Sequence, residues 1–321
     1  MTNSMIREIT SESLVSEVLL ERSGHGNPIF LVEGPSDETF YERHLANFNG
    51  GFVICFGKTN QDYAVDTLNQ INRIKGYVGL RDRDYDFLET MPSRSNQVVT
   101  DYCDMTMFTV ENDGFVVGLR ALVTKRSLDR LKKRLRQSVA EAIYEATLPI
   151  AAIRLVATKH GVSVEMDGFE FKYINRSPYN VDVTKLENGL RERLNTNSEK
   201  VSEIYLEARE IVAAGQHDAK SICSGHDYFR AAERFLKAHF SAPQVGAVDG
   251  PLLERIFVGS YDRSHFSETN MAGELRTWLA ENGYNANLIA RLWSREHNPT
   301  LSPPIKILRW TPKPFGATFP A

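Results

Sequence analysis

The most restrictive feature of the sequence is an alternation of strand-like and helix-like patterns between about residues 27 and 123. Runs that predict strands lie at Ile29–Val32, Phe52–Phe56, Tyr77–Leu80 and Gln97–Thr100, with a further candidate at Met105–Val110. A helix is expected over about Asp62–Ile74, and another where Ser36 can cap a first turn containing Asp37 and Glu38. Strands and helices that alternate at this spacing form parallel sheets with right-handed crossovers. The sequence therefore predicts an α/β fold.

The rest of the chain, from about Ser127, is predicted to be mainly helical. Leucines recur at helical spacing from Leu128 to Leu135, and Val139 continues the stripe. An alternating stretch at Val162–Tyr173 contains Asp167-Gly168, a good hairpin turn. Further helices are expected at Leu186–Ala214, His226–Phe240, Gly273–Asn282 and Ala286–Trp293, before an extended, proline-rich tail from Ser302. We expect an α/β domain with an N-terminal extension over residues 1–125 and a mainly helical region over residues 126–321.

Charge and cysteine content exclude several classes of protein. The formal net charge is −3, so any nucleic-acid surface must be a local patch. Three scattered cysteines form no CxxC pair, which argues against a disulfide framework or zinc site and suits a reducing cytoplasm. No apolar run reaches the ~20 residues of a membrane span, and the first ten residues lack a signal-peptide core. We expect a cytoplasmic protein without membrane contact.

Carboxylates follow two of the predicted strands. Glu33 ends the first strand, and Asp82 and Asp84 follow the third, where period-two spacing would send both to one side. Ligands gather at the carboxyl ends of parallel strands, so neighbouring strands would bring Glu33 opposite both aspartates. Three such carboxylates repel one another unless a cation lies between them, and hard oxygen ligands favour Mg²⁺ or Mn²⁺ over zinc. We therefore predict a metal site of these three residues, in which they are also the catalytic groups.

Other interpretations of these acids remain open. Glutamate followed by glycine is a common way to end a strand, and Asp82-Arg83-Asp84 is also typical of a solvated loop with local ion pairs. Asp37, a further candidate ligand, is already explained by the dipole of the helix that it begins. Asp86 fits a ligand or a loop equally well.

Four motifs together resemble the Toprim family, which includes topoisomerases, primases and overcoming-lysogenization-defect nucleases. They are FLVEGPSDETFY, the turn GKTN, DRDYD and TDYCDM, and the resemblance covers about residues 27–125. The fuller pattern is similar to Toprim effector subunits of anti-phage systems, such as the phage anti-restriction-induced defence system. The resemblance implies a Toprim-type parallel sheet, a magnesium-dependent endonuclease that cuts tRNA, an ABC-type ATPase partner that holds it until a phage protein triggers release, and a homodimer after release.

The fourth motif departs from the family pattern. A histidine is expected before the aspartate and an acidic residue two positions after it, but Cys103 and Thr106 occupy these places. Asp101 and Asp104 are retained, and Asp104 or Glu111 is a candidate replacement ligand. The departure puts a full two-metal site in doubt.

Gly57-Lys58-Thr59 looks like the end of a phosphate-binding loop but lacks the glycine that the Walker pattern needs at position 52, which is Phe52. We interpret it as a strand-to-helix turn, so any ATPase must be another chain.

A basic segment is the best candidate for a nucleic-acid surface. Seven cations lie within twelve residues: Lys125, Arg126, Arg130, Lys132, Lys133, Arg134 and Arg136. On a helix, Arg126, Arg130, Lys133 and Arg134 would lie on or near one face, suited to phosphate contacts. A solvated face or a docking surface for an acidic partner explains the row equally well. His226 is expected to be a helix-cap neighbour rather than a base, and the three tryptophans to be core or interface residues.

Two alternatives to a tRNA-cleaving effector remain. One is a DNA nuclease of the overcoming-lysogenization-defect type. The other is a non-catalytic Toprim module that only binds its ATPase partner or nucleic acid.

Overall fold

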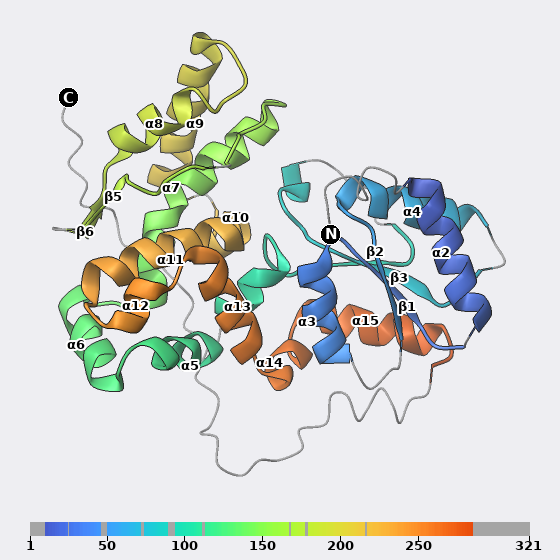
Figure 1. Cartoon of the computed structure of the whole chain (residues 1–321). Coiled ribbons are helices and arrows are strands. Elements are labelled where there is room, and N and C mark those ends of the chain that lie inside the picture. The colour runs from blue at the N-terminus through green and yellow to red at the C-terminus, as the bar shows by residue number, and fades with distance from the viewer. Residues whose placement is uncertain are drawn as a thin grey trace.

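The computed structural model describes residues 10–284, except for 25, 46–49, 72–73, 89–93, 111–112, 167, 177–178 and 216. Within these residues, a parallel sheet with helices on both faces forms one part of the molecule, and a mainly helical region forms the other (Figure 1). No helix in the described part of the chain is long and apolar enough to cross a membrane.

The sheet has four strands, all parallel, in the order β2-β1-β3-β4. The strands are β1 (Ile29–Val32), β2 (Gly51–Ile54), β3 (Tyr77–Arg81) and β4 (Gln97–Val99). The predicted α/β class is therefore confirmed, and β1 has the bounds expected from the sequence. Because β1 pairs with β3, the residues that follow these two strands leave the same edge of the sheet side by side.

Successive side chains of β1 pack on opposite faces of the sheet. Ile29 and Leu31 pack with α2 (Ser11–Gly24) and α4 (Lys58–Gln70) on one face. Phe30 and Val32 pack with α3 (Pro35–Leu45) and α15 (Asn270–Glu281) on the other. Figure 1 shows α15, from the far end of the described chain, lying beneath the sheet next to α3. The sheet therefore depends on a helix from the C-terminal part to cover its second face.

The helical region is built around α7, a long helix with buried residues along its whole length. Its helices are α5 (Asp113–Leu122), α6 (Lys125–Leu135), α7 (Val139–Lys159), α8 (Val183–Arg191), α9 (Ser198–Ala214), α10 (Ala219–Ile222), α11 (Gly225–His239), α12 (Pro243–Ala247), α13 (Gly250–Ser260) and α14 (Arg263–Ser267). Strands β5 (Ile174–Arg176) and β6 (Tyr179–Val181) form a small antiparallel pair. Two short 3-10 helices, η2 (Asp86–Leu88) and η3 (Met105–Val110), follow β3 and β4.

Three predictions near the sheet were wrong in detail. The candidate strand Met105–Val110 is η3, because the Asp104 carbonyl and carboxylate both accept the backbone N–H of Met107 and start a tight turn. Helix α3 begins at Pro35, whose fixed φ suits the first helical position, so Ser36 lies inside the first turn and is not its cap. Helix α4 begins at Lys58 rather than Asp62, directly after Gly57 with φ 120°.

The helical region also differs from the sequence patterns. The leucine stripe is divided between α6 and α7, because Arg136 adopts a left-handed conformation and Ser138 begins α7 with a capping box. The segment Leu186–Ala214 is two helices, since Asn197 caps α9.

The predicted hairpin at Asp167-Gly168 was misplaced. In the described residues around it, Val164 makes one isolated bridge with Leu194, and the paired strands are β5 and β6. Asp167, Ala286–Trp293 and the tail from Ser302 lie outside the described residues. Trp278 is buried, as expected for a core residue, while Trp293 and Trp310 lie outside the description.

Candidate active site

Glu33 and Asp82 meet at the edge where β1 and β3 end. The register pairs Val32 of β1 with Leu80 of β3, so the chain continues from both strands at nearly the same level. The Glu33 carboxylate accepts the backbone N–H of Asp82, with 3.0 Å between Oε1 and the nitrogen. The structure therefore brings together the first two residues of the predicted site, through the strand pairing on which the prediction depended.

Four of the predicted acids line one small pocket of ≈ 160 Å³. They are Asp37, Asp82, Asp84 and Asp104. The other lining residues are Ser36, Tyr85, Cys103, Thr106, Arg154, Ser224 and His226. Glu33 is not among the lining residues, but its carboxylate accepts the backbone N–H of Asp82. A single pocket therefore gathers acids from α3, from the loop after β3 and from the loop after β4.

Asp82 and Asp104 are held by backbone donors. Asp82 Oδ1 accepts the N–H of Met105 at 2.8 Å, and Asp104 Oδ2 accepts the N–H of Gly225 at 2.7 Å. Burial and then the charge of Asp104 raise the pKa of Asp82 well above its usual value. Burial also raises the pKa of Asp104 to about 6, although the bond from Gly225 opposes the change.

Glu33 and Asp37 are similarly perturbed. Burial, followed by the charges of Asp84 and Asp37, raises the pKa of Glu33 to about 7, against the opposing hydrogen bond from Asp82. Burial raises the pKa of Asp37 to about 6, although its Oδ2 accepts the N–H of Gly34 at 2.8 Å. Anionic carboxylates are disfavoured here, so a cation that enters the pocket would gain by neutralising them.

Lys58 lies between two of the predicted ligands. Its ammonium is 2.9 Å from Asp84 Oδ2 and 2.8 Å from Asp86 Oδ1, and Asp86 also pairs with the buried Arg81. Asp86 is absent from the described lining of the pocket and serves as an ion-pair partner, so its prediction as a ligand is not supported by this geometry. The sequence reasoning treated Lys58 only as part of a turn and missed its role.

The expectation that Asp84 lies in an extended segment, whose period-two spacing directs it to the same side as Asp82, was also wrong. Strand β3 ends at Arg81, and Asp84 has a φ of 47°, so the segment is a turn and not an extended strand. The N–H of Asp84 donates to the carbonyl of Cys103 at 2.7 Å, which ties the turn to the loop after β4. This tertiary contact, and not period-two alternation, places Asp84 at the pocket.

The helical region adds two cationic side chains: Arg154, which was not a candidate, and His226, which was expected only as a helix-cap neighbour and does lie in the first turn of α11. Arg154 reaches the pocket from α7 and forms an ion pair with Asp227 of α11, whose side chain is only 3% exposed. His226, in the first turn of α11, donates to Glu254 Oε2 at 2.9 Å, and this bond raises the pKa of His226 to about 9. Its side chain remains 71% exposed, so it lies at the mouth of the pocket.

The two departures from the family motif are both buried. Thr106 donates its hydroxyl to Glu254 Oε1 at 3.1 Å, while Cys103 lies against the pocket wall. Asp101 is not a ligand candidate in this geometry, because its two oxygens accept the backbone N–H groups of Asn270 and Met271 at the start of α15. Glu111 lies outside the described residues.

The donor chemistry of the pocket fits a hard divalent cation. As they stand, no three or more histidine, cysteine, aspartate or glutamate side chains of the described residues are arranged to hold a metal ion. The second carboxylate oxygens of Glu33, Asp37 and Asp82 nevertheless accept no hydrogen bond from the described part of the chain. Such oxygens are suitable ligands for Mg²⁺ or Mn²⁺ after small side-chain rotations.

The basic segment forms α6, with Thr124 as its N-cap. Arg130 and Arg134 line a groove of ≈ 650 Å³ beside α11, whereas Arg126 and Lys133 are exposed outside it. The four cations predicted to act together therefore divide into two pairs. Figure 1 shows α6 at the end of the helical region away from the sheet, so this surface is separate from the acidic pocket.

Comparison of the sequence with models of known protein families, and with curated proteins, gave no match.

Proposed function

We propose that this chain is a magnesium-dependent endonuclease of Toprim type, an effector of anti-phage defence that cleaves tRNA after release by an ABC-type ATPase partner. One observation carries the nuclease part: carboxylates from α3 and from the loops after the neighbouring parallel strands β3 and β4 share a pocket with Arg154 and His226. The four-stranded parallel sheet is compatible with the fold that the motifs resemble. The defence role, the tRNA target, the partner and a homodimer of the released subunit rest on the motif resemblance.

The pocket can support phosphodiester hydrolysis. Bound magnesium would polarise the scissile phosphate and activate the attacking water or hydroxyl. Asp82 and Asp84 are the side chains that would hold the metal, with Asp37 beside them. Glu33, whose pKa is about 7, can accept a proton near neutral pH and so act as the general base.

The two cations would act on the phosphate itself. Arg154 is fixed by Asp227, so its guanidinium can bind non-bridging phosphate oxygens without losing much conformational freedom. His226 is protonated at neutral pH, because Glu254 raises its pKa to about 9, and can donate a hydrogen bond to the leaving oxygen.

The direct test compares Glu33→Gln with the wild type. Purified protein is incubated with total RNA or with plasmid, in Mg²⁺ or EDTA. We expect magnesium-dependent RNA cleavage by the wild type, and loss of at least ~100-fold in Glu33→Gln if Glu33 is the general base. Glu42→Gln is the matched control, because Glu42 is exposed on α3, just after the segment that contains Glu33, and makes no ion pair with the described residues.

The same assay separates the alternatives. Plasmid cleavage without RNA cleavage would favour a DNA nuclease. A folded protein that cleaves neither, with or without its partner, would favour a non-catalytic module. Lys58 pairs with Asp84 and Asp86, so we expect it not to bind a nucleotide. ATP turnover by the isolated chain that is abolished by Lys58→Ala would contradict this expectation and the need for a separate ATPase.

A further inference from the structure

The groove beside α6 combines an apolar floor with an arginine rim. It has a volume of ≈ 650 Å³ and lies between the end of α5, α6, the end of α11 and α12. Leu131 and Phe240 belong to its floor, and Arg120, Arg130 and Arg134 to its rim. No carboxylate is among the described residues that line it. Its charge and size suit an anionic ligand larger than a single phosphate.

Two of the three rim arginines differ from the third and from the arginines of α11. Arg120 and Arg130 are exposed and make no ion pair or hydrogen bond with any described residue. By contrast, Arg230 and Arg234 of α11 donate to the backbone carbonyls of Met166 and Ile174. Arg134 is positioned by donating to His239 Nδ1 at 2.7 Å. Two cations on the rim therefore have their full hydrogen-bonding capacity available for a ligand.

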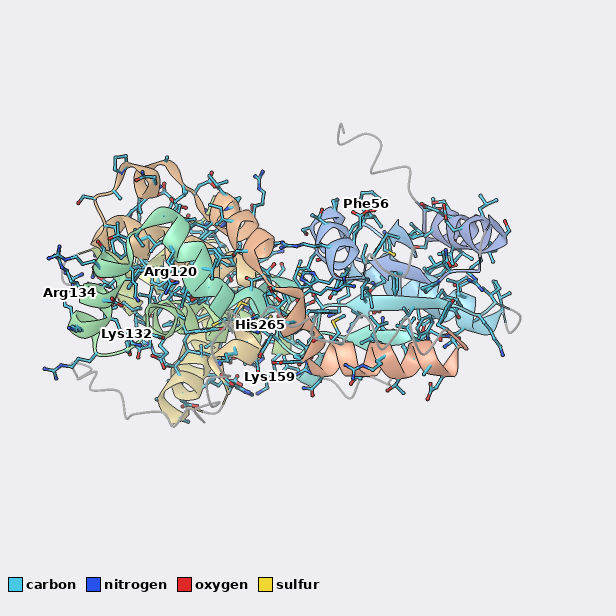
Figure 2. The ribbon with its side chains drawn as sticks, turned by 90° about the horizontal axis from the view of Figure 1, so that it is seen from below. Phe56, Arg120, Lys132, Arg134, Lys159 and His265 are labelled. Carbon is cyan, nitrogen blue, oxygen red and sulfur yellow. The ribbon has the colours of Figure 1, made fainter. Side chains whose placement is uncertain are left out.

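Helix α11 connects this groove to the acidic pocket. Its first residue, Gly225, donates to Asp104, and its last residue, His239, lines the groove. Fourteen helical steps at 1.5 Å place these two ends about 21 Å apart. Figure 1 shows α11 leading from the sheet side of the helical region towards α6 and α12, and Figure 2 shows Arg120 and Arg134 in the helical half of the molecule and Phe56 in the half that contains the sheet.

We propose that this groove is a distal anchor for the phosphodiester backbone of nucleic acid, with Arg120 and Arg130 as its main phosphate contacts. The inference deepens the proposed function, because it assigns the surface that holds the substrate away from the cleavage site. A strand that reaches from the pocket to the groove must span about 21 Å, which is roughly six steps at 3.4 Å each. Substrates shorter than this cannot contact both sites.

The test uses two charge-matched double variants. Arg120→Glu/Arg130→Glu reverses the groove pair, and Arg126→Glu/Lys133→Glu reverses two exposed cations of α6 outside the groove. Each variant changes the formal charge equally, so a general electrostatic effect would weaken both to the same extent. Both are made in full-length protein that also carries Glu33→Gln, and circular dichroism and thermal unfolding establish that they are folded.

Binding is measured in EDTA by fluorescence anisotropy with two RNA hairpins, one with a stem of about ten base pairs and one with about four. For the long hairpin, we expect the groove variant to lose roughly tenfold or more in affinity, and the magnitude of its salt slope to fall by about 1.4 to 1.8. The control variant should lose less than about threefold. For the short hairpin, the two variants should differ little.

Three results would overturn the anchor. The first is an equal loss of RNA affinity in both variants, which would indicate a general electrostatic effect of the protein's charge. The second is unchanged affinity for the long hairpin with loss of co-purification with the ATPase, which would make the groove a docking surface for an acidic protein. The third is an equal effect on both hairpins. Absence of cleavage in the Glu33-containing protein, together with groove-dependent binding, would instead reject the proposed nuclease and leave the anchor in place.

Discussion

The pKa of Glu33 depends on burial and on the charges of several residues of the pocket. Its carboxylate is held against the backbone of Asp82 but lies near Asp84 and Asp37, and burial raises its pKa to about 7. A carboxyl group whose pKa is raised by folding binds its proton more tightly in the native than in the unfolded state. Without a metal ion, ionisation of Glu33 therefore opposes folding.

The first prediction concerns stability against pH in EDTA. The contribution of protonated Glu33 to the stability of the folded protein is fully present below the unfolded pKa of this group, near 4.5. It is lost as pH rises towards about 7. We expect the free energy of unfolding to fall by roughly 1–3 kcal/mol over this window because of this group. Asp37 and Asp104, whose pKa values are raised to about 6, change stability in the same direction.

Urea unfolding at a series of pH values measures this loss. Glu33→Gln should have a shallower decline and be at least as stable as the wild type at pH about 8, and added Mg²⁺ should restore wild-type stability there. A wild-type stability that rises through this window would show that the carboxylates are not desolvated as described.

The second prediction concerns Arg154 and its partner Asp227. Arg154→Ala leaves a carboxylate that is 3% exposed without its partner, and should destabilise the protein by about 3–5 kcal/mol. Arg209→Ala is the control, because Arg209 is 49% exposed in its pair with Glu187. This variant should lose less than about 1 kcal/mol of unfolding free energy. Chemical denaturation of both variants checks the difference, and Arg154→Ala/Asp227→Ala should recover part of the loss. Equal effects of the two single variants would contradict a buried pair.

At the scale of elements, α11 is positioned by its close approach to the loop after β4. Gly225 has no side chain, and a Cβ added there would lie 2.5 Å from Thr106 Cβ and 2.8 Å from Asp104 Oδ1. This contact lets the N–H of Gly225 reach the Asp104 carboxylate and brings His226 to the pocket. A glycine at this position is required by the packing of two elements and not by an unusual φ angle.

The third prediction follows from that packing. Gly225→Ala should push α11 away from Asp104, lower stability by about 1–3 kcal/mol and reduce magnesium-dependent cleavage. Gly273→Ala, inside α15 with no atom within 4 Å of the added Cβ, should be neutral or stabilising by up to about 1 kcal/mol. Thermal unfolding and cleavage assays on the pair check this. If Gly225→Ala behaves like the control, the helix does not depend on this contact.

At the scale of the whole molecule, the sheet and the helical region depend on each other. The second face of the sheet packs against Met271, Leu275 and Leu279 of α15 and against Phe266 of α14, more than 160 residues beyond β4. The acidic pocket likewise takes side chains from both regions. A division of the chain at residue 125 therefore separates the sheet from part of its own core.

The fourth prediction concerns such a division. Residues 1–125 expressed alone should be insoluble or lack a cooperative unfolding transition, because the apolar face containing Phe30, Val32 and Val98 loses its cover. Joining residues 261–284 to this fragment by a flexible linker should restore solubility. Gel filtration and circular dichroism of the two fragments provide the measurement. A stable, monomeric 1–125 fragment would show that α15 is dispensable for the sheet.

The parallel α/β class and the placement of acids at the ends of two strands could be predicted from the amino-acid sequence alone. These are local properties: apolar runs of strand length, turn residues and helical spacing all lie within a few neighbouring residues. The same reasoning identified Glu33, Asp82, Asp84 and Asp37 as candidates, and the motif resemblance added Asp104. The four aspartates line one pocket, and Glu33 is bonded to the backbone of Asp82. It left Asp86 open between a ligand and a loop residue, because no local pattern reveals its ion pairs with Arg81 and Lys58.

The distant groups that complete the site, and the division of the surface cations, follow from contacts between elements that are far apart in the sequence. Arg154, His226 and Glu254 lie between 50 and 217 residues from the acids that they approach, and nothing in their neighbouring sequence marks them. The cover of the sheet by α15 and the separation of Arg130 from Lys133 are similarly set by packing between elements. Such contacts depend on burial and on complementary shape across the fold, and a period of two or 3.6 residues carries no information about them.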